Sequence, residues 1–137
     1  IKECDKVIML GHGCEYGLFA PTSPKEPYGR LIINSKHVEF LREKECIGIW
    51  CNANIFFEKY GLKGFYTGMI ISELEEAQMC SVKTDKDELL DQNFIFGDLL
   101  GDCIMFSPKG IYTYMTRTLS ENKCEVAKFN RENLFCS

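Results

Sequence analysis

The sequence predicts an α/β fold, a three-layer sandwich with a mostly parallel sheet and helices on both faces. Three short apolar runs, at residues 6–10, 46–50 and 65–71, have the composition of buried strands. Segments with helix-start signals lie between and after these runs. Strands that alternate with helices favour parallel pairing, and a β-hairpin after the first strand is the irregular part of the fold.

Composition indicates a folded chain of one domain over residues 1–137. Its 45% hydrophobic content, with ten Phe and six Tyr, excludes a disordered chain, and its formal charge of −4 argues against a general nucleic-acid or membrane-surface binder. No apolar run approaches the roughly 18–20 residues that span a bilayer. The start shows no signal-peptide pattern, so we expect a cytoplasmic protein. The first strand begins almost at once, and we therefore expect N-terminal strands to be lacking.

The elements of the first half follow from local signals. Gly11 to Gly13 end the strand at residues 6–10, and residues 17–20 and 28–33 are the expected hairpin arms. The proline-rich stretch 21–27 joins them, because proline fixes φ and lacks an N–H. Ser35 is the expected cap of a helix over residues 35–44, with Val38 and Leu41 facing inward.

Cap residues predict the remaining helices. Asn52 precedes a short helix, Ala53–Tyr60, which Gly61 stops. Ser72 with Glu75, and Asp85 with Glu88, have capping-box spacing, and Ser107 is followed by Pro108 at the first helical position. Residues 126–135 are ambiguous. The expected apolar faces of the last two predicted helices contain Leu89, Phe96, Leu100 and Cys103 in one and Ile111, Met115 and Leu119 in the other.

The eight cysteines indicate reduced thiols. They form no CxxC pair and have no His-rich partner segment, so a zinc knuckle is not expected, and Cys46 and Cys103 look like core positions. Asp98 and Asp102 have i, i+4 spacing but share their face with no histidine. We expect no metal and no cofactor.

His12 and Cys51 are the candidate catalytic residues, because each follows a predicted core strand directly. Neighbouring parallel strands would bring the imidazole and the thiol to the same carboxyl edge, where open sheets bind ligands. Amides at the helix start after Cys51 can stabilise a thiolate, and His12 can accept the thiol proton and protonate a leaving amine. The N–H groups of Gly13 and Cys51 are the candidate oxyanion-binding groups.

The residues around this pair resemble a known family. The run from His12 to Phe19 is similar to the caspase pattern of His-Gly, a short turn, Gly and a hydrophobic strand, and residues 47–51 stand where that family has its next strand and its nucleophile. The chain thus resembles the caspase-like (clan CD) cysteine peptidases, which include legumains, gingipains and separase, over residues 5–72. The resemblance implies a His12–Cys51 dyad, an oxyanion held by Gly13, and a peptide or protein substrate.

The chain also departs from the caspase pattern. Trp50 precedes the cysteine where caspases have a small Ala, and Asn52-Ala53 follow it in place of Arg-Gly. The two strands that precede the histidine strand in the family and the arginine-rich aspartate pocket have no equivalent here, so aspartate specificity is not implied. Glu15 and Glu73 are the candidate substrate-pocket residues, Glu73 because it follows the third strand.

Other interpretations stay open. Cys14 is a candidate second thiol or redox-sensitive partner, and His37 a candidate alternative base. A catalytically inactive caspase-like module for protein binding or signalling is the main alternative function, and a small nucleotide- or metabolite-binding domain is a third. The sequence predicts no oligomeric state.

Overall fold

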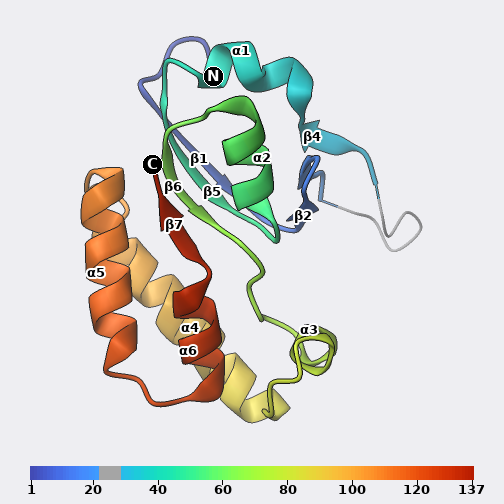
Figure 1. Cartoon of the computed structure of the whole chain (residues 1–137), viewed down its shortest axis with the longest axis vertical. Coiled ribbons are helices and arrows are strands. Elements are labelled where there is room, and N and C mark those ends of the chain that lie inside the picture. The colour runs from blue at the N-terminus through green and yellow to red at the C-terminus, as the bar shows by residue number, and fades with distance from the viewer. Residues whose placement is uncertain (22–28) are drawn as a thin grey trace. The chain divides into compact units, whose positions relative to one another are not determined.

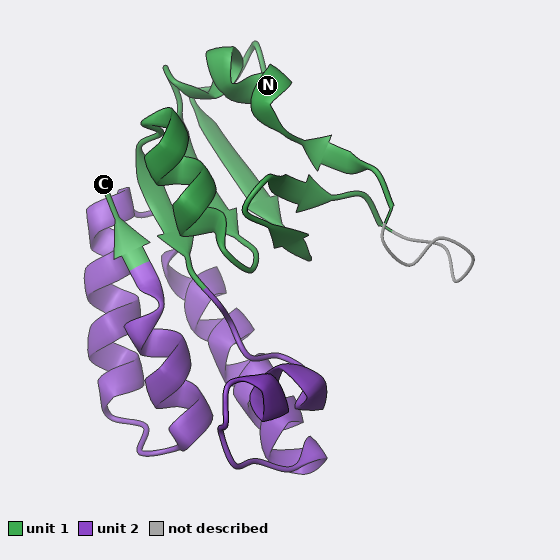
Figure 2. Cartoon of the chain, turned by 45° about the vertical axis from the view of Figure 1, so that its right-hand side comes forward, with its two compact units in different colours: residues 1–68, 135–137 green, residues 69–134 purple. Residues whose placement is uncertain are grey.

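The computed structural model describes residues 1–21 and 29–137, which form two compact units. Unit 1 comprises residues 1–68 and 135–137, and unit 2 comprises residues 69–134 (Figure 2). The expectation of one domain over residues 1–137 stays a prediction.

Unit 1 is built on a mixed, mostly parallel sheet (Figure 1). The strand order is β1 (Lys6–Leu10), β5 (Glu45–Ile49), β6 (Gly64–Thr67) and β7 (Leu134–Cys136). β5 pairs in parallel with β1 and with β6. Gly64 and Ser137 exchange both of their backbone N–H···O bonds, at 3.1 and 2.9 Å, as opposite residues of antiparallel strands do. The α/β class and the mostly parallel sheet are therefore confirmed, and β7 is the antiparallel member.

The predicted hairpin belongs to a second, antiparallel sheet. Its strand order is β2 (Gly13–Cys14), β3 (Gly17–Phe19) and β4 (Leu31–Ile33). β3 and β4 are the expected arms, whereas β2 was not predicted. The predicted loop over residues 21–27 lies outside the described residues except for Pro21, and so does Tyr28 of the second predicted arm.

The prediction that Ser35 caps a helix through Lys44 was wrong. Asn34 is the cap: its Oδ1 accepts a hydrogen bond from the N–H of Lys36 (3.0 Å), and its own N–H donates to Nδ1 of His37 (3.1 Å). The helical segment is short, with η1 (Ser35–His37) followed by α1 (Val38–Leu41). Val38 and Leu41 are buried, as predicted. The N–H of Lys44 bonds to the carbonyl of Leu41 (3.0 Å), which turns the chain into β5.

α2 (Ala53–Tyr60) has the predicted bounds and covers one face of the sheet (Figure 1). It ends at Gly61, whose φ of 64° is left-handed. Asn52 occupies the predicted N-cap position, although its side chain makes no capping bond. The rings of Phe56 and Phe57 are fully buried against the sheet. The same core contains Met9, Leu18, Ile33, Val38, Leu41, Cys46, Trp50, Ala53, Leu62 and Tyr66.

The third predicted strand, residues 65–71, is shorter in the structure. β6 ends at Thr67, and the carbonyl of Gly68 accepts a bond from the N–H of Asn52 (3.1 Å). Further on, the side chain of Asn130 bonds both backbone groups of Ile71, at 2.8 Å to its N–H and 3.2 Å to its carbonyl. A buried carboxamide therefore satisfies the backbone of Ile71 in place of a neighbouring strand.

Unit 2 contains four α-helices: α3 (Leu74–Met79), α4 (Lys86–Cys103), α5 (Pro108–Ser120) and α6 (Glu125–Glu132). Asp85 and Ser107 cap α4 and α5 as predicted, accepting bonds from the N–H groups of Glu88 (2.8 Å) and Gly110 (3.1 Å). The predicted capping box at Ser72 was wrong. Glu73 occupies the N-cap position of α3, and the Ser72 hydroxyl donates to Glu76 (2.9 Å).

The predicted apolar faces of α4 and α5 agree with the burial in unit 2. Leu89, Leu100 and Cys103 of α4 are buried and Phe96 is half-buried, and Ile111, Met115 and Leu119 of α5 are all buried. The ambiguous residues 126–135 are divided between α6 and the start of β7.

Candidate functional site

The ends of β1 and β5 form one edge of the sheet in unit 1. Leu10 pairs with Ile49 in the parallel register, and the N–H of Gly11 donates to the carbonyl of Ile49 (3.1 Å). His12 and Cys51 each stand two residues beyond this last pair, on neighbouring strands that run in the same direction. The predicted pairing of the two strands is thus confirmed, and both residues lie at the carboxyl edge of the sheet.

Cys51 stands at a sharp strand-to-helix corner that β6 holds in place. The buried hydroxyl of Thr67 donates to the carbonyl of Trp50 (2.9 Å), which also accepts the N–H of Ala53 (3.2 Å). Asn52 has φ 67° and ψ 25°, a left-handed conformation that Asn adopts more readily than most residues. Cys51 is half-buried. The corner therefore fixes the backbone of Cys51 immediately before the first turn of α2.

Trp50 connects this corner to the segment around His12, residues 11–14, which we call the histidine loop. Its side chain is only 2% exposed, and its indole Nε1–H donates to the carbonyl of Cys14 (3.0 Å). A Cβ atom at Gly13 would overlap the indole ring, so glycine at this position allows the loop to lie directly on Trp50. Phe56 and Phe57 pack on the ring, each with its centroid 5.9 Å away. Trp50 thus packs between the core and the histidine loop and fixes the position of that loop.

This role of Trp50 was not inferred from the sequence. In the sequence, Trp50 stands out only as a departure from the caspase pattern. In the structure it packs under the residues that follow His12. The sequence holds only a general signal, since a buried indole needs an acceptor for its N–H, and it does not indicate which carbonyl supplies that acceptor.

The backbone of the histidine loop is anchored by the hairpin. The carbonyl of His12 accepts a hydrogen bond from the N–H of Phe19 (2.9 Å), so His12 and Phe19 are a hydrogen-bonded pair. Such pairs alternate along antiparallel strands, and Gly13, opposite Leu18, is therefore at a non-hydrogen-bonded position. The N–H of Gly13 points away from β3 as a result. His12 itself is exposed.

The other candidate residues lie in different places. Glu15 is half-buried in the two-residue turn that joins β2 to β3, in the same hairpin as His12. Glu73 is exposed at the start of α3 in unit 2. His37, considered as an alternative base, accepts the N–H of Asn34 at its Nδ1 as part of the cap. Cys14 is half-buried in β2, and its carbonyl receives the Trp50 indole.

The cysteines differ in their surroundings, although all eight are free thiols. Burial raises the pKa of the Cys46 thiol to about 11, with smaller contributions from the charges of Cys4 and Glu45. Burial also raises the pKa of Cys103. Thiols of this kind stay protonated near neutral pH and are poor nucleophiles. Cys46 and Cys103 are therefore core side chains, as expected.

Neither a metal-binding cluster nor a membrane-spanning helix occurs among the described residues. In residues 1–21 and 29–137, no three His, Cys, Asp or Glu side chains gather closely enough to hold a metal ion. No helix within these same ranges has both the length and the apolar character needed to cross a membrane.

The chain matches no protein-family model, no curated protein and no solved structure. The caspase-like resemblance therefore stays a proposal.

Proposed function

We propose that this chain is a cysteine peptidase of the caspase-like type, a hydrolase of peptide bonds that uses a His12–Cys51 dyad. One observation carries the proposal: both residues stand at equivalent positions beyond the paired ends of β1 and β5. A three-layer sandwich with helices on both faces of the sheet belongs to the same proposal.

The proposed reaction has two stages. In the first, His12 accepts the proton of Cys51 as Sγ bonds to the substrate carbonyl carbon, and the carbonyl oxygen takes up the negative charge. The intermediate then collapses, the C–N bond breaks, and His12 gives the proton to the departing amine. In the second, water attacks the thioester and gives a proton to His12. The C–S bond then breaks, the carboxylic acid leaves, and His12 returns its proton to Sγ of Cys51.

The N–H groups of Gly13 and Cys51 are the proposed oxyanion donors. The N–H of Gly13 points away from β3, so the pairing of the hairpin does not use it, which supports this role. Amides held rigidly at such a position stabilise developing charge without reorganising, and the loss of one donor typically costs about 3 kcal/mol of transition-state stabilisation. Glu15, in the same hairpin as His12, stays a proposed substrate-pocket residue, whereas that role for Glu73 stays a prediction from the sequence.

Labelling with a thiol-directed peptide electrophile, such as a fluorescent acyloxymethyl ketone, tests the nucleophile. We expect the wild-type chain to be labelled and Cys51→Ala to lose the label. Cys14→Ala is the matched control, because it removes a half-buried thiol from the same site, and it should keep the label. His12→Ala should slow labelling by about two orders of magnitude, the usual contribution of a positioned acid–base group.

Two outcomes contradict the proposal in different ways. Label that persists in Cys51→Ala places the nucleophile elsewhere. A folded wild-type chain that no peptide electrophile labels supports the inactive binding module instead. Circular dichroism of each variant separates loss of chemistry from loss of fold.

A further inference from the structure

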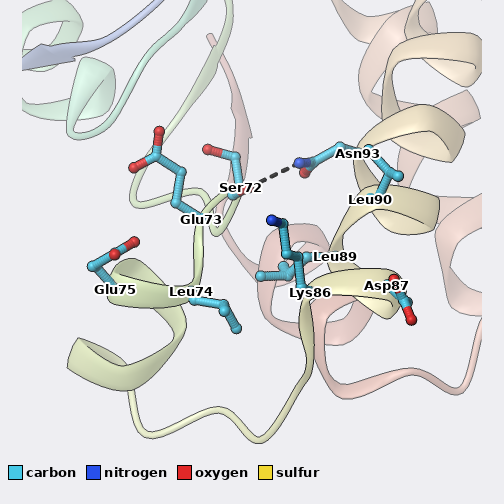
Figure 3. A pocket seen from close by; sticks show the side chains of 9 residues that line it. All are labelled: Ser72, Glu73, Leu74, Glu75, Lys86, Asp87, Leu89, Leu90 and Asn93. Carbon is cyan, nitrogen blue, oxygen red and sulfur yellow. Dashed lines mark hydrogen bonds between the residues drawn. The ribbon is translucent and has the colours of Figure 1, made fainter.

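Unit 2 contains a cavity of about 450 Å³, within the range typical of small-ligand sites. It lies between residues 72–75, at the start of α3, and the first two turns of α4 (Figure 3). All of its lining residues belong to unit 2, so it is independent of the cysteine and histidine of unit 1.

The walls of the cavity are held by hydrogen bonds. The side-chain Nδ2 of Asn93 in α4 donates to the carbonyl of Ser72 (2.8 Å), which ties the two walls together. The Ser72 hydroxyl donates to Glu76 (2.9 Å), and Asp85 caps the N-terminus of α4. The cavity is therefore formed before any ligand arrives, which reduces the ordering cost of binding.

The floor of the cavity is apolar. Leu89 is only 4% exposed and belongs to the core of unit 2, with Leu74 packed against the same core. Leu90 lines the cavity beside it and is 70% exposed. An aliphatic stem can lie along these leucines and remove the exposed face of Leu90 from water.

Acidic side chains predominate among the charged groups. Glu73, Glu75 and Asp87 line the cavity together with a single cation, Lys86. Figure 3 shows Asp87 turned to the outer side of α4 and the Lys86 ammonium directed toward Ser72 and Glu73. Even without Asp87, the carboxylates outnumber the ammonium group. A ligand carboxylate would meet like charges here, whereas a ligand cation would offset them.

We propose that this cavity binds an aliphatic cation, the ammonium or guanidinium head of a basic side chain in a peptide. The stem lies over Leu89 and Leu90, and the head lies between the carboxylates of Glu73 and Glu75. The ammonium group of Lys86 repels this ligand. The exposed, flexible side chain of Lys86 swings outward as the cation enters. The proposal extends beyond the chemistry proposed for Cys51 and does not depend on it.

Titrations of the full chain with capped amino acids, followed by NMR chemical shifts, test the proposal. The probes are N-acetyl-lysine methylamide, its neutral counterpart from norleucine, and its acidic counterpart from glutamate. The lysine probe should bind most tightly and should weaken as salt is added. Glu75→Gln should weaken it about two- to fivefold, the effect of one partly exposed ion pair. Lys86→Met should strengthen it by a similar factor.

Charge-matched controls lie on α6, which contributes none of the lining residues. Glu132→Gln and Lys128→Met change the same charges there and should leave binding unchanged. Cys51→Ala should also bind the lysine probe normally, so failure of the peptidase proposal and failure of this one are distinguishable.

Three results overturn the inference. Equal binding of the norleucine and lysine probes would show that the cavity recognises only the apolar stem and not the charge. Preference for the glutamate probe, with weaker binding in Lys86→Met, makes it an anion site. No saturable shift at the lining residues with any probe shows that the cavity holds no such ligand.

Discussion

The indole of Trp50 joins the two halves of the candidate active site. Its N–H holds the carbonyl of Cys14, and its face supports Gly13, while its own carbonyl is held by Thr67. The residue next to the candidate nucleophile therefore also sets the position of the loop with the candidate base. Substitutions that disturb this contact should change reactivity at Cys51 without touching its sulfur.

Gly13→Ala tests this contact. The added methyl group would overlap the Trp50 ring, so we expect the free energy of unfolding to fall by about 1–3 kcal/mol, as in other overpacked cores. Labelling of Cys51 should slow in the same variant. Gly97→Ala is the control, because it adds the same methyl group to α4 in open space, and it should stabilise the chain by about 0.5–1 kcal/mol.

Urea unfolding gives both free energies, and a peptide electrophile gives the labelling rate. Equal stability and equal labelling in Gly13→Ala and wild type would show that the loop does not depend on its contact with the indole.

The positions of His12 and Cys51 at the sheet edge could be predicted because both depend on strand composition and on one parallel pairing. The role of Trp50 could not, because it depends on a hydrogen bond to Cys14, which lies 36 residues earlier in the chain. Periodicity identifies which side chains are buried. It does not identify the polar partner that a buried indole finds.

Among the elements, the caps of α4 and α5 were predicted correctly. Asp85 has Glu88 three residues later and Ser107 is followed by Pro108, and both are caps in the structure. Asn34 and Ser35 are adjacent, and both are good caps, so local sequence does not choose between them. The side chain of His37 decides the choice by accepting the N–H of Asn34.

Asn34→Ala should therefore lower the free energy of unfolding by about 1 kcal/mol, the usual cost of losing a cap. Ser35→Ala should change it by no more than a few tenths of a kcal/mol, because Ser35 is exposed and lies inside the helical turn. Thermal or urea unfolding of the two variants measures this difference. A larger loss in Ser35→Ala than in Asn34→Ala would contradict the capping assignment.

At the scale of the whole molecule, unit 1 combines residues from both ends of the described chain. The rings of Phe135 and Tyr66 stack with centroids 6.1 Å apart, and Ser137 bonds to Gly64 through its backbone and to Leu62 through its hydroxyl (3.1 Å). The sequence did not predict this return, because β7 is only three residues long and residues 126–135 have no clear period. The residues that this C-terminal segment contacts, Leu62, Gly64 and Tyr66, lie far earlier in the chain.

Deletion of residues 135–137 should destabilise unit 1 by about 3 kcal/mol, from the loss of two backbone hydrogen bonds and one aromatic contact. Ser137→Ala removes only the hydroxyl bond and should cost no more than about 1 kcal/mol. Urea unfolding, followed by the fluorescence of the buried Trp50, reports on unit 1 directly. Equal midpoints for the deletion and the full chain would show that β7 contributes nothing to the sheet.

The late position of β7 also has a consequence for biosynthesis. A ribosome releases β6 long before it releases β7, since all of unit 2 must be translated in between. Throughout that interval the edge of β6 in the nascent chain stays unpaired, and unpaired strand edges promote aggregation. The sheet that positions His12 and Cys51 is therefore completed only once translation has passed Ser137.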